Sequence, residues 1–246
     1  KMAQSRVKMI AKMEIPDIKQ SSRLSPSFQF KSVRPSGKWV VRVKDLSKNF
    51  QEKKLFQHLN FEVKRGEKVA IMGENGIGKS TLIKILLDTI PSDQGSVEWG
   101  YETHTSYFSQ DHHDLLNKHI NVLAWLEQYA AGISEQSIRK TLAQVLFNKE
   151  DVLKDILALS GGEAARLLLA KMVLESANVL ILDEPTNHLD IEATEALASA
   201  LRNYPGTLLF VSHDRHFINK IADRILFISH EKKLQDVKRL DAINLD

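Results

Sequence analysis

The chain has 246 residues, 43% of them apolar, and a formal net charge of only +3. This length suits one α/β domain with an appendage, and the apolar fraction is ordinary for a globular core. The lack of cysteine excludes a disulfide framework and a thiolate zinc site, and it fits a reducing compartment. No apolar run reaches the roughly 18–20 residues of a membrane-spanning helix, and no secretory signal is visible. Because the chain opens at Lys1, we interpret it as part of a longer protein.

The charge is unevenly distributed along the chain. Residues 1–38 hold nine Lys or Arg against Glu14 and Asp17, a net of +7, so the other residues carry −4. A basic arm on a mildly acidic domain is typical of proteins with a polyanionic partner such as nucleic acid. A solvated linker that is basic by chance would show the same charge, so this observation alone leaves both interpretations open.

The predicted elements begin with a basic helix in residues 1–14, where apolar side chains recur at helical spacing. Three prolines between residues 15 and 38 indicate irregular structure. Short strands are then expected at 39–43, 59–63, 69–72, 96–99 and 106–108, with a helix at 81–87. Residues 115–158 return to helical spacing, which predicts a helical insertion. From residue 159 the pattern alternates: helix 162–175, strand 178–183, helix 191–203, strand 207–211, helix 215–221, strand 224–228. This alternation predicts a parallel sheet with helices on its faces.

Residues 73–81, GENGIGKST, fit the phosphate-loop pattern G-x-x-x-x-G-K-[ST] between a predicted strand and a predicted helix. Glycines let backbone N–H groups surround phosphate oxygens, and the helix N-terminus adds the positive end of its dipole. Lys79 supplies a charge for the β- and γ-phosphates, and the Ser80 hydroxyl is a Mg²⁺ ligand. The predicted nucleotide-binding residues of this loop are Gly73, Asn75, Gly76, Gly78, Lys79, Ser80 and Thr81. The alternative, a chance loop of this composition, does not explain the strand–loop–helix context.

Two carboxylates follow the apolar run of residues 178–182. In a phosphate-loop enzyme Asp183 at such a strand end holds Mg²⁺, and Glu184 is placed to orient and polarise the attacking water. An exposed acidic pair is the alternative, which the phosphate loop makes weaker because ligands bind at the carboxyl ends of parallel strands.

Residues 159–163, Leu-Ser-Gly-Gly-Glu, open a predicted helix. Ser160 can cap this helix, and the glycines let the backbone approach a phosphate group. The residues alone leave open whether this is a phosphate contact or a plain capped helix start.

These motifs, in this order over residues 39–229, resemble an ABC-type ATPase domain. The resemblance implies an α/β fold with a parallel phosphate-loop core sheet, an antiparallel β portion and a helical subdomain over about 112–160. It implies ATP hydrolysis with Glu184, His213 and Lys79 in catalysis, and with Mg²⁺ held by Ser80, Gln110 and Asp183. It also implies that Phe50 stacks on adenine and that Leu189 and Asp190 cross to a partner domain. The family's signature sequence is matched by Ser160, Gly161, Gly162 and Glu163, which would contact a nucleotide bound to that second ABC domain.

A narrower resemblance is to the ABC-F proteins, tandem ATPases that act on ribosomes. It is carried by Asn187-His188, by residues 213–217 and by the basic arm, and residues 21–26 most resemble the YbiT-like branch. It implies that residues 1–38 are the end of an interdomain linker and that residues 39–246 are the second ABC domain. The implied partners are the other ABC domain and the ribosome with its ribosomal and transfer RNA, in the cytoplasm, without DNA or a membrane.

Two other functions share the same nucleotide chemistry. One is the ATPase subunit of a membrane transporter, against which Asn187-His188 and the basic arm argue. The other is an interaction module switched by ATP, against which the presence of both Glu184 and His213 argues. Residues 111–114, Asp-His-His-Asp, are expected to form an exposed loop rather than a zinc site, and Trp125 is expected in the helical core.

Overall fold

The computed structural model describes residues 25–50, 53–112, 115–231 and 233–238, which form two sheets and a helical region. β1 (Trp39–Phe50) pairs antiparallel with β2 (Lys53–Lys64) and β4 (Gln94–Trp99) in a three-stranded sheet. The second sheet has the order β5-β6-β7-β3-β8-β9 and is parallel except for its edge strand β9. Its strands are β3 (Lys68–Gly73), β5 (Thr105–Phe108), β6 (Val179–Asp183), β7 (Thr207–Val211), β8 (Arg224–Ile228) and β9 (Leu234–Val237). The predicted parallel sheet is confirmed.

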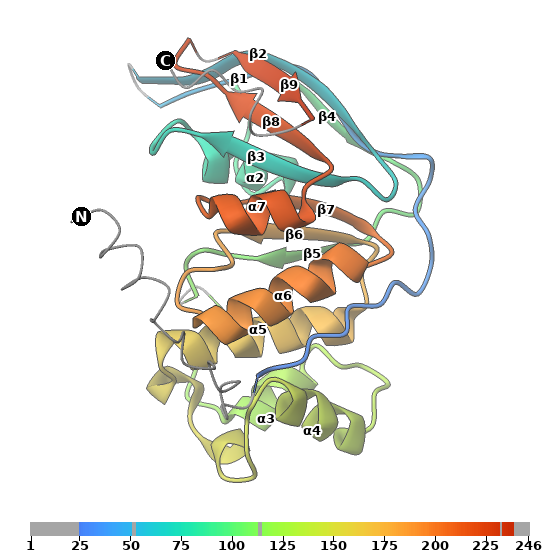
Figure 1. Ribbon diagram of the computed structural model, residues 1–246, viewed down its shortest axis with the longest axis vertical. Helices are drawn as coiled ribbons and strands as arrows, with labels where there is room; N and C mark the ends of the chain where they lie inside the picture. The colour runs from blue at the N-terminus through green and yellow to red at the C-terminus, as the bar shows by residue number, and fades with distance from the viewer. Residues whose placement is uncertain (1–24, 51–52, 113–114, 232, 239–246) are drawn as a thin grey trace, which may run out of the picture.

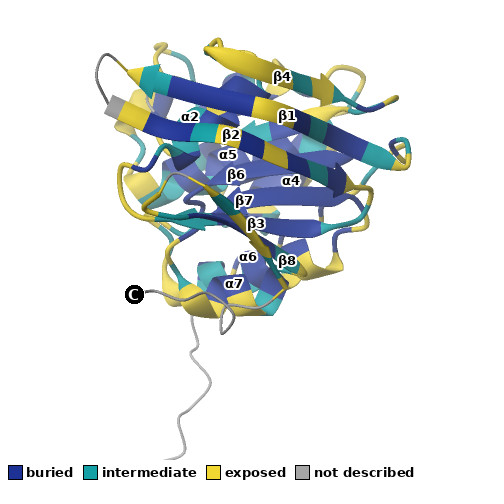
Figure 2. Ribbon diagram, turned by 90° about the horizontal axis from the view of Figure 1, so that it is seen from above, coloured by how far each residue is buried: buried dark blue, intermediate teal, exposed yellow. Residues whose placement is uncertain are grey.

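Each face of the six-stranded sheet contributes to a different apolar core. On β6, Val179 and Ile181 join the core around α2 (Lys79–Leu86), which the three-stranded sheet also lines. Leu180 and Leu182, on the other face, join the core under α5 (Gly161–Glu175), α6 (Ile191–Asn203) and α7 (Arg215–Ile221). Because successive side chains of a strand point to opposite faces, both sets are buried only when both faces are covered. Figure 2 shows the central strands dark blue along most of their length.

The helical subdomain lies at the end of the molecule opposite the three-stranded sheet (Figure 1). It contains α3 (Val122–Glu127), α4 (Glu135–Gln144) and the 3₁₀ turns Asp151–Leu153 and Ile156–Ala158. Asn121 and Ser134 cap the two helices by accepting backbone N–H bonds, which fixes where each helix begins. Trp125 is 2% exposed, so its predicted place in the core is confirmed.

An N-terminal strap, residues 25–38, runs along one side of the molecule from the helical subdomain to β1 (Figure 1). Phe28 and Phe30 are buried in the same core as α5 and α6. Their rings stack at 6.3 Å between centroids, and Phe30 also meets Tyr204 edge-on at 6.3 Å. The predicted domain boundary after residue 38 stays a prediction, but the strap on its N-terminal side contributes to the core.

Hydrogen bonds to backbone atoms of the strap fix it at several places. The Ser27 N–H donates to the carbonyl of Gln144 at 2.8 Å, in the helical subdomain. The Asn178 side-chain amide donates to the carbonyl of Arg34 at 3.0 Å, beside the parallel sheet. The Gly37 N–H donates to a carbonyl in the turn after β4 at 2.9 Å. The strap therefore contacts all three parts of the molecule.

Phe30→Ala should destabilise the folded chain by about 3 kcal/mol, the lower end of the range for a buried phenylalanine, because the strap can detach locally. Urea unfolding of the two proteins measures this difference in free energy. The matched control is Val33→Ala, which removes an apolar side chain that is 78% exposed on the same strap and should cost under about 0.5 kcal/mol. Equal effects of the two substitutions would contradict a core role for Phe30.

Candidate active site

The phosphate loop connects β3 to α2 and requires glycine at two positions. Gly73 has φ 151° and Gly78 has φ 106°, values that L side chains rarely adopt. A Cβ on Gly73 would lie 2.7 Å from the carbonyl oxygen of Ile228, and one on Gly78 would lie 3.0 Å from Cβ of Leu55. No side chain caps α2 at Gly78, so its first-turn N–H groups face the loop. This arrangement is the anion-binding geometry that the motif predicts.

Lys79 lies at the centre of the loop. Its ammonium group donates to the carbonyl oxygens of Gly73 and Glu74, each at 2.9 Å, and the side chain is mostly buried. Burial lowers the pKa of Lys79, and the nearby carboxylates of Glu184 and Asp183 oppose that shift. The ammonium is therefore fixed in direction by two carbonyls and faces two carboxylates.

The carboxylates of Asp183 and Glu184 are buried at the end of β6, with 1% and 7% of each residue exposed. Asp183 Oδ1 and Glu184 Oε1 accept no hydrogen bond from the described residues. Burial raises the pKa of both groups, while the Ser80 hydroxyl opposes this for Asp183 and His213 opposes it for Glu184. Buried carboxylate oxygens without donors, beside a serine hydroxyl, are the hard oxygen ligands that suit Mg²⁺.

His213 lies against Glu184 at the end of β7. Its backbone N–H donates to Glu184 Oε2 at 3.3 Å, and its Nε2 atom lies 3.2 Å from Glu184 Oε1 without completing a hydrogen bond. The side chain of His213 is 53% exposed, whereas that of Glu184 is 8% exposed. The histidine therefore lies between the buried carboxylate and the open side of the pocket.

A pocket of about 630 Å³ joins the residues from these separate elements. Phe50 comes from the three-stranded sheet and is 48% exposed, with the Lys48 ammonium 5.3 Å from its ring centroid. The predicted residues that line this pocket are Phe50, Asn75, Gly76, Gly78, Lys79, Ser80, Thr81, Gln110, Glu184 and His213. Leu55, Asn187 and Val211 line it too, and of these only Asn187 had been singled out in the sequence, as a mark of a subfamily.

Two predicted residues lie beside this pocket rather than on its wall. Gly73 forms the base of the phosphate loop, where it packs on β8. Asp183 lines a neighbouring cavity of about 520 Å³, together with Ser80 and Gln110. The three predicted Mg²⁺ ligands therefore share one cavity wall.

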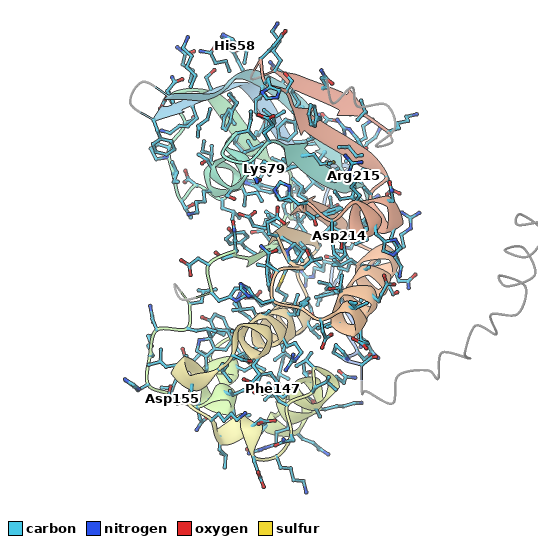
Figure 3. All side chains as sticks on the ribbon, turned by 60° about the vertical axis from the view of Figure 1, so that its left-hand side comes forward. His58, Lys79, Phe147, Asp155, Asp214 and Arg215 are labelled. Atoms are coloured by element: carbon cyan, nitrogen blue, oxygen red, sulfur yellow. The ribbon has the colours of Figure 1, made fainter. Side chains whose placement is uncertain are left out.

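The residues of the signature sequence lie at the N-terminus of α5 and are not among those that line the pocket with Lys79. The Ser160 hydroxyl accepts from the N–H of Glu163, and the Glu163 carboxylate accepts from the N–H of Ser160, which completes a capping box. Glu163 also pairs with Lys154 at 2.9 Å. Figure 3 shows Lys79 in the upper part of the molecule and Asp155 and Phe147 of the helical subdomain in the lower part. The helix cap is confirmed, and a nucleotide contact by Ser160, Gly161, Gly162 and Glu163 stays a prediction.

The expectation of an exposed loop after Gln110 is wrong for His112. This histidine is buried, and its ring meets Phe108 edge-on at 5.2 Å and His188 edge-on at 5.9 Å. His188 lies on another loop far along the chain, so a local pattern could not reveal the burial. Asp111 is exposed as expected, and residues 113–114 lie outside the described residues.

Asp183→Asn should raise the thermal midpoint of unfolding at neutral pH. An acid whose folded pKa is raised costs stability above its unfolded pKa, because the folded state disfavours the charged form. The gain should shrink as the pH falls through the folded pKa and vanish below the ordinary aspartate pKa of about 3.9, where the native side chain is protonated in both states. Thermal unfolding of both proteins across pH measures this difference. The control is Asp236→Asn, which changes an exposed aspartate on β9 that pairs with Arg224 and should give no gain. An equal gain there would contradict the role of burial.

Comparison with known proteins identifies the family. The family model described as ABC transporter matches residues 56–187. The ATP-binding protein YdiF of Bacillus subtilis is 46% identical over 93% of this chain, and YbiT of Escherichia coli O157:H7 is 40% identical over 94%. Arabidopsis thaliana ABC transporter F family member 5 is 35% identical over 88%. The matched regions are 36%, 44% and 32% of those proteins, so the chain spans less than half of their length.

Solved structures agree with this assignment at the level of the fold. The dimeric ABC transporter cassette MJ0796 has a TM-score of 0.71 at 19% identity and covers 80% of this chain and 98% of its own. Among the described residues, no helix is both long and apolar enough to cross a bilayer. The chain belongs to the ABC transporter family, as an ATP-binding cassette with the α/β fold of its ATPase domains.

Proposed function

We propose that this chain is the second ATPase cassette of a tandem ABC-F type protein that acts on the ribosome in the cytoplasm, preceded by the end of its interdomain linker. The observation that carries the ATPase part is the pocket in which Lys79, Glu184, Gln110 and His213 meet. The ABC-F part is supported by the relatives named as F family members and by the Asn187-His188 pair. The basic arm supports a polyanionic partner, although most of it, residues 1–24, lies outside the described residues.

The chemistry is hydrolysis of ATP by positioned groups without a covalent intermediate. Phe50 stacks on the base, while the loop N–H groups and the Lys79 ammonium bind the phosphates. Ser80, Gln110 and Asp183 would hold Mg²⁺, which would neutralise charge on the phosphate oxygens. Glu184 orients a water towards the γ-phosphorus and takes up its proton, and His213 contacts the γ-phosphate.

The signature residues act on another nucleotide. Ser160 and Gly161 do not line the pocket that contains Lys79, although Gly161 lines the neighbouring cavity with Ser80. In line with the resemblance to ABC domains, these residues serve a site on the second cassette, and two cassettes close on two ATP molecules. The isolated chain therefore holds half of each complete site. Closing and opening of the pair would bring the linker onto ribosomal and transfer RNA or withdraw it.

Ribosome co-sedimentation of the full-length protein tests this function. A protein carrying Glu184→Gln should pellet with ribosomes when ATP is present, and it should lose this when Lys79→Ala is added. The binding should also weaken as salt rises, because phosphate contacts release counterions. Failure to pellet while nucleotide closure is confirmed separately, or co-purification with a membrane partner, would favour a transporter subunit instead.

A further inference from the structure

His188 joins three functional loops of the cassette. It lies in the turn after Glu184, where its own φ is 70°, and it lines the cavity that Gln110 and Gly161 also line. Its chain is held there by two turn hydrogen bonds, from the N–H of Asn187 to Glu184 and from the N–H of Leu189 to Thr186. A short turn with backbone hydrogen bonds therefore connects His188 to the backbone of Glu184, the proposed catalytic residue.

The His188 ring contacts the loop that carries Gln110. It meets the ring of His112 edge-on, with 5.9 Å between centroids and 66° between planes. His112 in turn meets the buried Phe108, the last residue of β5, and its carbonyl accepts the N–H of Leu116 at 3.1 Å where the chain enters the helical subdomain. Since Gln110 lies between these two aromatic side chains in sequence, the contacts limit how far its loop can move.

The same side chain lies on the first turn of α5. A Cβ on Gly161 would come within 3.1 Å of His188 Nδ1, and a Cβ on Gly162 would come within 2.9 Å of the His188 carbonyl oxygen. The absence of side chains at Gly161 and Gly162 thus lets the turn that carries His188 pack closely against the start of α5, in addition to any approach of the glycine backbone to a nucleotide. This approach brings the start of α5 against the loop that follows Glu184.

We propose that His188 is a positioning residue that fixes the Gln110 loop and the start of α5 relative to Glu184. Its ring contacts both elements, so a shift of either one changes the placement of the catalytic loop. The site that hydrolyses ATP in this cassette is thereby coupled to the signature surface that the same cassette presents to its partner. This inference rests on ATP hydrolysis at the proposed site and is independent of ribosome binding.

Steady-state ATP hydrolysis by the intact protein tests the catalytic consequence. His188→Ala should lower kcat about 10- to 100-fold with less than about a two-fold change in the affinity for ATP, because a misplaced catalytic group costs rate rather than ground-state binding. His188→Phe keeps an aromatic edge against His112 and should recover most of the rate. The control His216→Ala removes an exposed histidine of α7 and should leave kcat unchanged.

A cycle of substitutions tests the contact itself without any activity. Gly161→Ala should lower the thermal midpoint of the native protein. In the His188→Ala background the ring is gone, so Gly161→Ala should raise the midpoint of that variant or leave it unchanged. Gly162→Ala is the matched control, because the His188 carbonyl that it meets remains in both backgrounds, so it should lower the midpoint in both.

The outcomes separate this inference from the proposed ATPase site. Suppose that Glu184→Gln abolishes hydrolysis. The positioning role would then be overturned by an unchanged kcat in His188→Ala. It would also be overturned if His188→Phe fails to recover the rate and the midpoints in the Gly161 cycle are additive. If Glu184→Gln has no effect either, the assignment of the ATPase site itself is wrong.

Discussion

Glu184→Gln should slow ATP hydrolysis by about 10²- to 10⁴-fold, the range for loss of a general base, while ATP still binds. Glutamine has nearly the same shape but cannot take up a proton at neutral pH. The carboxylate that it replaces is 8% exposed and keeps Oε1 without a hydrogen bond from the described residues, which leaves this oxygen for a water. Turnover and equilibrium nucleotide binding of the full-length protein measure the two effects separately.

The control for this substitution is Glu127→Gln, which changes an exposed carboxylate of α3 and should leave turnover at the native level. Loss of ATP binding in Glu184→Gln would mean that Glu184 acts in binding. Native turnover would exclude it as the base. Turnover of the native and variant proteins is compared in a background in which the other cassette cannot hydrolyse ATP, so that a single active site is observed.

Lys79→Ala should weaken ATP binding by about 10²- to 10⁴-fold. A hydrogen bond to a charged group contributes about 1.5–3 kcal/mol, so the loss of two such bonds to phosphate costs roughly 3–6 kcal/mol. The side chain is buried and already held towards the loop by two carbonyls, so little conformational entropy is lost when phosphate binds. Titration with a fluorescent ATP analogue measures the affinity.

Lys140→Ala, which removes an exposed lysine on α4, should leave that affinity unchanged. Thermal unfolding of the Lys79 variant separates a local loss of binding from a disrupted loop, since Gly73 and Glu74 lose their shared donor. A native-like affinity in a folded Lys79→Ala protein would refute the assignment of the loop.

The helices and inner strands of the cassette could be predicted from sequence because their local signals agree with their tertiary place. Predicted helices 191–203 and 215–221 and strands 207–211 and 224–228 coincide with α6, α7, β7 and β8. Asp190 and Asp214 cap the helices, and each strand is apolar after its first residue. β1 and β2 are much longer than predicted. Most of their extra residues are polar or charged, the few apolar ones (Leu46, Phe50, Leu55 and Phe56) do not alternate regularly with them, and register shifts interrupt the pairing. β9 was missed because it is a short edge strand whose pairing with β8 defines it.

The convergence of the site could be predicted where the parallel sheet dictates it. Gly73 and Asp183 end the two strands that flank β7, and His213 follows β7 by two residues, so they meet at one edge of the sheet. The contribution of Leu55 to the pocket could not be predicted, because Leu55 comes from the other sheet and no local pattern fixes how the two sheets pack. The burial of His112 by His188 has the same physical origin, a contact between distant loops.

The strap imposes an order on folding during synthesis. Phe30 is among the first of the described residues to leave the ribosome, yet its ring packs on Tyr204 and on a core built largely from later segments. At about 5–20 residues per second, some 10–35 s pass between the synthesis of these two residues. The strap cannot dock until α6 has been synthesised, and until then its two phenylalanines remain exposed. Its docking is therefore a late step that closes a long loop in the core and joins the strap to the assembled cassette.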